Sequence, residues 1–378
     1  MDKATLNVEV LRARVAERDL VWVELRAVGG VPVLPEAVLV LDRSGSMAGQ
    51  KLQEAKAAAS ALLSSLPQGA RLAMVAYDHE VLVGGFSPKE ARTLLRSLEA
   101  RGQTALHAGW KQGAELLRDR ARPRFVLLLS DGLANVGLTN LEALAEEARK
   151  AAEAGVYTFT FGFGEDFDRR LMVSLALAGG GTHFYAAQGE LGEALEGELA
   201  FLKGPVNLGV RVALGGKLRH LAPFALGERR VLLLQANGVG PLEVVARTPE
   251  GEVRSHHPLP SFAPEGTEAW RKVELEALIQ DAAELLEREA RSQEEAQVLR
   301  GKVLALLEHL RGHPLGSEPR AQALMEALEA HGESLAWLHK HYDPRVSDRM
   351  ARESTAYSTR LLSEQRLLSL NYRKRTEE

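Results

Sequence analysis

The feature that most constrains this chain is an alternation of short apolar runs and helix-like segments over about residues 36–203. The runs AVLVLD (37–42), RLAMVAY (71–77) and RFVLLLSDG (124–132) are continuous and apolar, as expected of strands buried on both faces of a sheet. Segments with helical spacing of Leu and Ala come between them, for example KLQEAKAAASALLSSL at 51–66. This alternation predicts an α/β fold with a doubly wound, mostly parallel sheet.

The rest of this region supplies the outer elements of the predicted sheet. The apolar and β-branched residues of EVLVGG (80–85) predict an edge strand, and those at 156–164 and 182–187 predict two more strands. Helical spacing, with Gly or Pro near the segment ends, predicts further helices at 87–98, 106–119, 141–155, 168–181 and 190–204.

A different pattern flanks the α/β region on both sides. Apolar and polar residues alternate at 5–15 and 20–28, which predicts half-buried strands, and short strands of the same kind return in 205–258. Two strands are too few for a core of their own, so we expect both segments to form one β-sandwich into which the α/β domain is inserted.

The C-terminal part of the chain is predicted to be helical. The Pro-rich segment 256–266 indicates a linker, and the amphipathic spacing that follows it, with Gly and Pro breaks, predicts three or four helices packed as a bundle or as hairpins. The expected domains are therefore a β-sandwich from 1–34 plus 205–262, an α/β domain at 35–204 and a helical domain at 265–378.

The composition excludes several classes of protein. The formal net charge of −4 provides no basic excess for binding nucleic acid, and the lack of cysteine excludes disulfides, cysteine metal sites and a thiol nucleophile. No apolar run approaches the roughly 20 residues that span a bilayer, and the charged N-terminus lacks the apolar core of a signal peptide. We expect a cytoplasmic protein that neither inserts into membranes nor binds nucleic acid.

Polar residues follow the ends of the predicted core strands. Asp42, Ser44 and Ser46 come directly after the first strand, Thr104 precedes the helix at 106, and Asp131 follows the strand at 124–129. In an open α/β sheet, ligands bind at the carboxyl ends of the strands. These residues offer only oxygen atoms, which suits a hard cation such as Mg²⁺ or Mn²⁺, with Ca²⁺ as a further candidate.

The spacing and charge of this set suit one divalent ion. Alternate residues of an extended turn point the same way, so Asp42, Ser44 and Ser46 can bind one ion together. The two carboxylates balance a divalent charge, and the hydroxyls of Ser and Thr add none. Because Mg²⁺ takes about six ligands, a position is left for water or for an external carboxylate.

The motif Asp-x-Ser-x-Ser with a downstream Thr and Asp resembles the metal-ion-dependent adhesion site of von Willebrand factor A domains. All of its positions match here, as Asp42, Ser44, Ser46, Thr104 and Asp131. The flanking text LVLDRSGSM, GQTAL and LLLSDGLANVG is also similar, with Gln103 where the usual form has a second glycine. The resemblance covers about 36–203. The longer arrangement is similar to bacterial cytoplasmic proteins that add flanking strands and C-terminal helices.

This resemblance implies a role for each residue of the motif. Asp42, Ser44 and Ser46 would bind the metal directly, Thr104 would do so in the ligand-bound form, and Asp131 would bind directly or through water. The family binds protein partners through a Glu or Asp that completes the coordination of the metal, and it is generally not catalytic. We therefore expect a divalent-metal-dependent protein-interaction module, acting as a scaffold or regulator and not as an enzyme.

Two alternatives remain. A metal-dependent phosphatase or other hydrolase could use an Asp after the first strand, although Ser44 stands where such enzymes need a second acid. A structural protein with a vestigial metal site is the other alternative. A serine nucleophile and a nucleotide-binding loop are not expected, because the chain has neither a Gly-x-Ser-x-Gly elbow nor a Walker lysine after a glycine loop.

Residues near the predicted ligands are candidates for a rim that contacts the partner. They are Arg43, Asp78, His79, His107 and Asn135. Each also has a simpler interpretation. Arg43 is expected to face away from the ion, Asp78 and His79 lie at a turn, and His107 starts a helix. Asn135 is a typical residue for holding a loop through its side chain.

Overall fold

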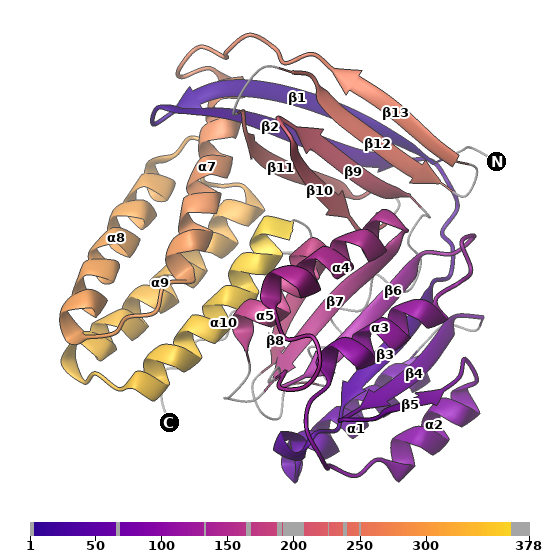
Figure 1. The fold of residues 1–378 in the computed structure, drawn as a ribbon. Coiled ribbons are helices and arrows are strands. Elements are labelled where there is room, and N and C mark those ends of the chain that lie inside the picture. Colours follow the sequence, from indigo (N-terminus) through magenta and orange to yellow (C-terminus); the bar gives the residue numbers. More distant parts are fainter. Residues whose placement is uncertain are drawn as a thin grey trace.

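The structure is a computed structural model, and Figure 1 shows its three parts: a central sheet with helices, a pair of antiparallel sheets, and a C-terminal group of helices. It describes residues 4–65, 69–131, 134–163, 168–186, 191, 208–225, 227–236, 240–248 and 251–363.

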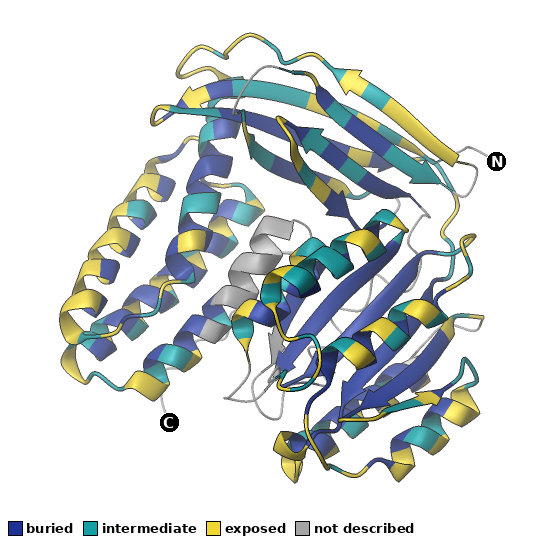
Figure 2. Ribbon diagram, viewed as in Figure 1, coloured by how far each residue is buried: buried dark blue, intermediate teal, exposed yellow. Residues whose placement is uncertain are grey.

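The central sheet has six strands in the order β5-β4-β3-β6-β7-β8. Their bounds are β3 Glu36–Asp42, β4 Arg71–Tyr77, β5 Val81–Gly84, β6 Arg124–Ser130, β7 Val156–Phe163 and β8 Gly180–Ala186. All neighbours are parallel except β5, which pairs antiparallel with β4 at one edge. Every residue of β3 and β6 is buried, as the continuous apolar runs predict (Figure 2). The predicted doubly wound α/β fold is confirmed.

Helices cover both faces of this sheet. They are α1 Gln50–Ser65, α2 Pro88–Ser97, α3 Leu106–Leu116, α4 Leu141–Glu153 and α5 Arg169–Ala178, with a short 3₁₀ turn at Gly45–Met47. Leu39 packs in a core with α1 and α2, whereas its neighbour Val40 packs in a core with α3, α4 and α5. Successive residues of β3 therefore supply opposite faces. The helix predicted at 190–204 lies outside the described residues, apart from Leu191.

Two antiparallel sheets form the sandwich. One contains β1 Thr5–Val15, β2 Arg18–Val28 and β11 Arg229–Gln235, in the order β1-β2-β11. The other contains β9 Gly209–Leu214, β10 Lys217–Leu221, β12 Leu242–Thr248 and β13 Gly251–His257, in the order β10-β9-β12-β13. Val21, Val23 and Leu25 of β2 share a buried core with Val210 and Val212 of β9. The N-terminal hairpin thus completes the sandwich of the later strands, and the α/β region lies between them in the sequence.

Four described helices follow the sandwich: α7 Glu268–Leu286, α8 Gln293–Gly312, α9 Pro319–Lys340 and α10 Pro344–Ser363. Helix α7 packs on the outer face of the first sheet, where Val273 and Ala277 share a core with Trp22. Arg18 Nη1 also lies 2.7 Å from Asp281 Oδ1 of α7. Helix α10 lies beside α5 and β8 (Figure 1). None of the described helices is both long enough and apolar enough to cross a bilayer.

Candidate metal centre

The chain turns sharply where β3 ends, and this turn brings three of the predicted ligands together. Asp42 is fully buried, and its Oδ1 accepts a hydrogen bond from the Ser44 backbone N–H at 2.8 Å. The Ser44 and Ser46 hydroxyl oxygens lie 3.0 Å apart, so both point to the same side of the turn. The Gly45 N–H donates to the Gly102 carbonyl at 3.1 Å, which joins this turn to the loop that carries Thr104.

The Asp42 carboxylate is held by its neighbours in the sheet. Its Oδ2 accepts hydrogen bonds from Ser130 Oγ at 2.6 Å and from Tyr77 Oη at 3.2 Å. Burial raises the pKa of Asp42 to about 6, and the charge of Asp131 adds to that rise, while the hydrogen bonds from Ser130 and Ser44 oppose it. A carboxylate with a raised pKa is one whose charge is incompletely balanced by its surroundings.

Asp131 carries the clearest mark of a cation site. It is fully buried, and one of its oxygens, Oδ2, lies 3.3 Å from Lys51 Nζ. Within the described part of the chain, no hydrogen-bond donor reaches the other oxygen, Oδ1. A buried carboxylate oxygen without a partner is costly and rare in native proteins. A bound cation would remove that cost, so the donor set fits a hard metal ion.

The Thr104 loop is fixed from behind by Asn135. Thr104 is buried, its backbone N–H donates to Asn135 Oδ1 at 2.8 Å, and its carbonyl accepts from the Asn135 N–H at 3.1 Å. Asn135 therefore positions Thr104 through a pair of hydrogen bonds. His107 faces helix α4, where its Nε2 lies 2.8 Å from Glu147 Oε2.

Arg43 and Asp78 do not lie on the rim, so that part of the sequence prediction is wrong. Both are buried, with exposed fractions of 5% for Arg43 and 0% for Asp78, and Arg43 Nη2 lies 2.9 Å from Asp78 Oδ2. Arg101 Nε contacts the same oxygen at 2.9 Å. The ion pair links the turn after β3 to the turn after β4. The Asp78 carbonyl also accepts a hydrogen bond from the Ala105 N–H at 2.8 Å, which joins both turns to the Thr104 loop. His79 remains exposed on this edge.

Sequence reasoning missed several residues that shape the centre. Tyr77 ends β4 directly beside Asp42 in the sheet register, and Ser130 ends β6. Lys51 lies in the first turn of α1, and Arg101 precedes the Thr104 loop. Ser130 could have been suspected because it precedes Asp131, but the other contacts depend on strand order and loop packing.

Asp78, His79 and Glu80 form a second group whose ligand atoms lie within 4.8 Å of one another. Asp78 is already paired with Arg43 and Arg101, and Arg101 also contacts Glu80. These two cations neutralise the two carboxylates, which disfavours a metal ion at this group.

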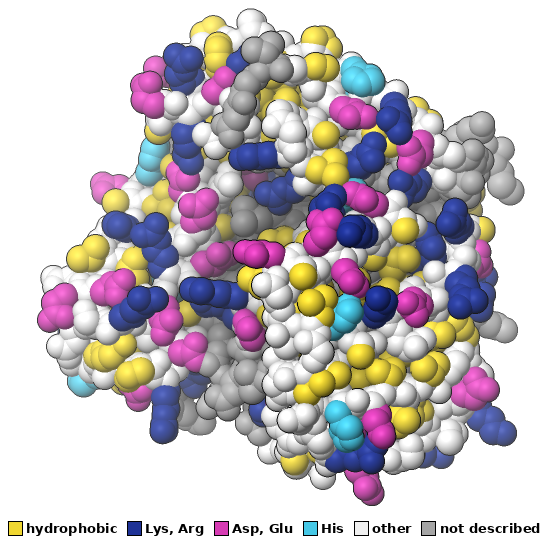
Figure 3. Space-filling view, viewed as in Figure 1, with side chains coloured by type: hydrophobic (Ala, Val, Ile, Leu, Met, Phe, Trp, Pro, Cys, Tyr) yellow, Lys and Arg dark blue, Asp and Glu magenta, His cyan; other side chains and the backbone are white. Residues whose placement is uncertain are grey.

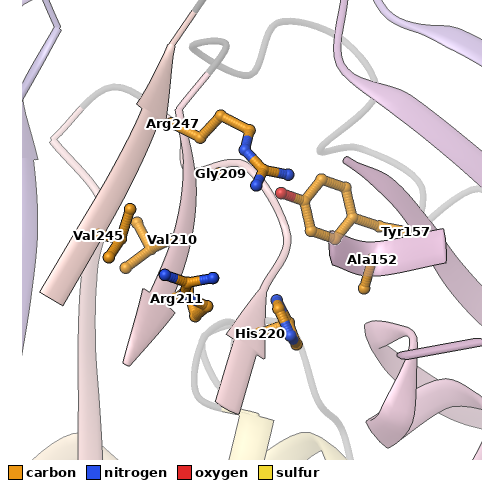
Figure 4. A pocket seen from close by; sticks show the side chains of 8 residues that line it. All are labelled: Ala152, Tyr157, Gly209, Val210, Arg211, His220, Val245 and Arg247. Carbon is orange, nitrogen blue, oxygen red and sulfur yellow. The ribbon is translucent and has the colours of Figure 1, made fainter. Parts of the chain in front are cut away.

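A small pocket of mixed polar and apolar lining lies between the α/β domain and the sandwich, and its polar side chains are Tyr157, Arg211, His220 and Arg247 (Figure 4). Burial lowers the pKa of His220 to about 4 and raises that of Tyr157 to about 12. Arg247 donates to the Glu153 carbonyl near the C-terminus of α4. A cation at that end of a helix is stabilising. Because Arg247 belongs to β12 of the sandwich and Glu153 to α4 of the α/β domain, we interpret the pocket as part of the contact between the two domains.

The surface in Figure 3 mixes acidic and basic side chains, and the described residues on this face form no continuous basic area. This distribution agrees with the formal net charge of −4.

Comparisons with known proteins point to one family for the central region. Residues 36–193 match the von Willebrand factor type A domain family. The inter-alpha-trypsin inhibitor heavy chain H3 of Mesocricetus auratus is 30% identical over 178 residues, which is 43% of this chain and 20% of that protein. The human heavy chain H3 is 30% identical over 174 residues, or 41% of this chain and 19% of that protein. The match therefore spans about a fifth of these relatives.

Two solved structures share the whole architecture. A von Willebrand factor type A protein from Catenulispora acidiphila has a TM-score of 0.66 at 17% identity, covering 95% of this chain and 97% of that chain. The ArnB paralog VWA2 from Sulfolobus acidocaldarius has a TM-score of 0.60 at 17% identity, covering 96% of this chain and 99% of that chain. At this identity the likeness concerns the fold.

Proposed function

We propose, from the premise that residues 36–193 form a von Willebrand factor type A domain, that this domain is a divalent-metal-dependent protein-interaction module. Asp42, Ser44, Ser46, Thr104 and Asp131 would hold Mg²⁺ or Mn²⁺ at the carboxyl edge of the sheet. A Glu or Asp of a partner protein would complete the coordination. The observation that carries the proposal is the buried Oδ1 of Asp131, which has no hydrogen-bond partner among the described residues.

The surroundings of the site support this role. When bound, a divalent cation supplies a positive point charge that an anionic oxygen of a partner can contact. The protein's own contribution is to hold the ligands in advance. Ser130 and Tyr77 fix the Asp42 carboxylate, Asn135 fixes Thr104, and the bond between Gly45 and Gly102 ties the two loops together. Such preorganisation lowers the cost of binding.

The contacts of Asp42 argue against the hydrolase alternative. A nucleophilic carboxylate must present an unshared electron pair to the atom that it attacks. Asp42 is fully buried, its Oδ1 accepts from the Ser44 N–H, and its Oδ2 accepts from both Ser130 and Tyr77. Beside these bonds one lone pair of Oδ1 remains. The proposed metal ion would take it, which leaves none for attack on a substrate.

Metal binding by the purified full chain tests the proposal. Titration calorimetry with MgCl₂ and MnCl₂ should show one site in the wild type, and Asp131→Asn should lose it, because the variant removes a charge from the site. Glu115→Gln, at an exposed position of α3, is the matched control. At a free metal concentration of 100 times the Kd, the wild type should gain about 2.7 kcal/mol of stability.

A pull-down from native cytosol then tests the partner interaction. The partner should bind wild-type protein in Mg²⁺ and should be lost both in EDTA and with Asp131→Asn. Equal recovery of the partner in EDTA would refute the metal-dependent contact. Turnover of p-nitrophenyl phosphate that is lost in Asp131→Asn but kept in Glu115→Gln would favour the hydrolase instead.

A further inference from the structure

Lys51 is a cation placed where the helix itself disfavours one. It is the second residue of α1, and no acidic residue lies in the first turn of that helix. A positive side chain near a helix N-terminus is opposed by the helix dipole. Its ammonium lies 3.3 Å from Oδ2 of the fully buried Asp131, which offsets that cost. The pairing points to a role for Lys51 at the metal centre.

The contact divides the two oxygens of Asp131 between two tasks. Oδ2 faces the Lys51 ammonium, while Oδ1 has no hydrogen-bond donor within the described part of the chain. Lys51 thereby orients the carboxylate so that a single oxygen remains for a metal ion. Asp131 is not free to turn both oxygens toward that ion without giving up the ion pair.

Lys51 also changes the formal charge of the centre. Asp42 and Asp131 carry two negative charges, and Lys51 returns one positive charge, leaving the centre at about −1 by formal counting. The neighbouring group adds no net charge, because Arg43 and Arg101 are matched by Asp78 and Glu80. With a divalent cation bound, the centre would therefore be formally positive by one unit.

We infer that Lys51 is a specificity-determining residue, which restricts the completing ligand to an anionic oxygen; this inference rests on the proposed function. One carboxylate returns the loaded centre to neutrality, whereas a hydroxyl, an amide or water leaves its charge uncompensated. Without Lys51 the loaded centre would be neutral before any ligand arrives. A carboxylate would then lose part of its electrostatic advantage over a neutral ligand of the same shape, and the metal ion alone would supply the rest.

Acetate and acetamide are a matched pair of probes for this charge selection. Protein loaded with Mn²⁺ is titrated with each compound, and the relaxation rate of water protons reports the displacement of Mn²⁺-bound water. The wild type should prefer acetate, and Lys51→Met should reduce the acetate-to-acetamide affinity ratio about tenfold, which lies between the effects of a unit charge about 4 Å away in bulk water and near a protein surface. Mn²⁺ itself should bind Lys51→Met several-fold more tightly, because a like charge is gone.

Lys56→Met is the control, since it removes the same charge from the same helix. Lys56 Nζ contacts the carbonyls of Arg96 and Leu98, at 3.3 Å and 3.1 Å, and not the metal centre. This variant should keep the wild-type affinity ratio, and Lys51→Arg should largely restore it. Circular dichroism and thermal melting check that each variant is folded.

The outcomes separate this inference from the proposed function. If the wild type binds Mn²⁺ and Lys51→Met keeps the wild-type affinity ratio, the inference is wrong and the metal-dependent module stands. If the ratio falls equally in Lys56→Met, the effect is one of overall charge and the inference is also wrong. If the wild type fails to bind Mn²⁺ at all, the proposed function fails first and the role of Lys51 falls with it.

Discussion

At the scale of single residues, the candidate metal centre contains buried carboxylate groups that cost stability in the absence of a cation. Asp42 keeps a buried charge, and Asp131 keeps a buried oxygen without a donor among the described residues. The types of these residues and their order along the chain led to the predicted ligand set, which stays a prediction until metal binding is measured. The pairing of Lys51 with Asp131, and of Arg43 with Asp78, could not be predicted, because each joins residues that only the folded loops bring together.

The loss of folding stability that the buried Asp42 carboxylate causes can be measured in metal-free protein. Its folded pKa of about 6 lies above the usual value near 4, so the folded state holds the proton more tightly and loses stability as the pH rises through this interval. The ionised carboxylate therefore costs roughly 3 kcal/mol at pH 8. Asp42→Asn removes the charge but weakens some hydrogen bonds, so we expect a net gain of about 1–2 kcal/mol in EDTA.

Urea denaturation at pH 8 tests this trade between stability and binding. Mg²⁺ should stabilise the wild type and leave the stability of Asp42→Asn unchanged. The difference in unfolding free energy between the two proteins should therefore shrink or change sign when the metal is added. A lower stability of the Asp42→Asn variant than of the wild type in EDTA would contradict the expectation.

At the scale of elements, close packing of α3 on the sheet positions the centre. A Cβ built on Gly109 would lie 2.4 Å from Tyr77 Cδ1, and one on Gly113 would lie 2.5 Å from Val40 Cγ2. The apolar runs predicted the core strands well. The start of β8 was missed, since the helix was expected to continue to residue 181. Gly180 instead adopts a φ of 70°, and at Gly181 a Cβ would lie 2.2 Å from the Thr158 carbonyl oxygen, so glycine is required where the strand begins.

Gly109→Ala should therefore disturb both packing and metal binding. The new methyl group pushes the Tyr77 ring, whose hydroxyl donates to Asp42, so we expect a loss of about 1–3 kcal/mol and weaker Mn²⁺ binding. Gly301→Ala in α8 is the matched control, because nothing lies within 4 Å of a Cβ there. It should gain about 0.5–1 kcal/mol and bind Mn²⁺ normally. Calorimetry and denaturant unfolding of both variants measure these effects, and similar behaviour of the two would refute the packing argument.

At the scale of the whole molecule, the sequence predicted the parts better than their contacts. The inserted arrangement followed from the fact that two N-terminal strands cannot form a core alone. The docking of α7 on β1 and β2, and of α10 beside β8, could not be predicted, because amphipathic spacing shows that a helix has a buried face and not what covers it.

The helical part should respond to acid through His331. This residue of α9 is fully buried, its Nδ1 lies 3.0 Å from Ser354 Oγ of α10, and burial lowers its pKa to about 4. In the unfolded chain His331 takes up a proton near pH 6.5, whereas in the folded chain it does so only near pH 4. The free energy of unfolding should therefore fall by roughly 3 kcal/mol as the pH drops from 6.5 to 4. Urea denaturation at a series of pH values, followed by circular dichroism, measures this loss. His331→Asn should flatten the slope, and an unchanged slope would count against His331.

The pairing of β2 with β11 has a consequence for how the protein is made. Glu24 and Arg229 contact each other across this pair, although they are 205 residues apart. At a synthesis rate of about 5–20 residues per second, the N-terminal hairpin emerges roughly 10 to 40 s before its partner strand exists. During that interval the apolar face of β2 has no sheet to cover it. The inserted domain therefore has time to fold on the ribosome first. Until β11 is made, the hairpin exposes apolar residues of β2, and a chaperone could bind them.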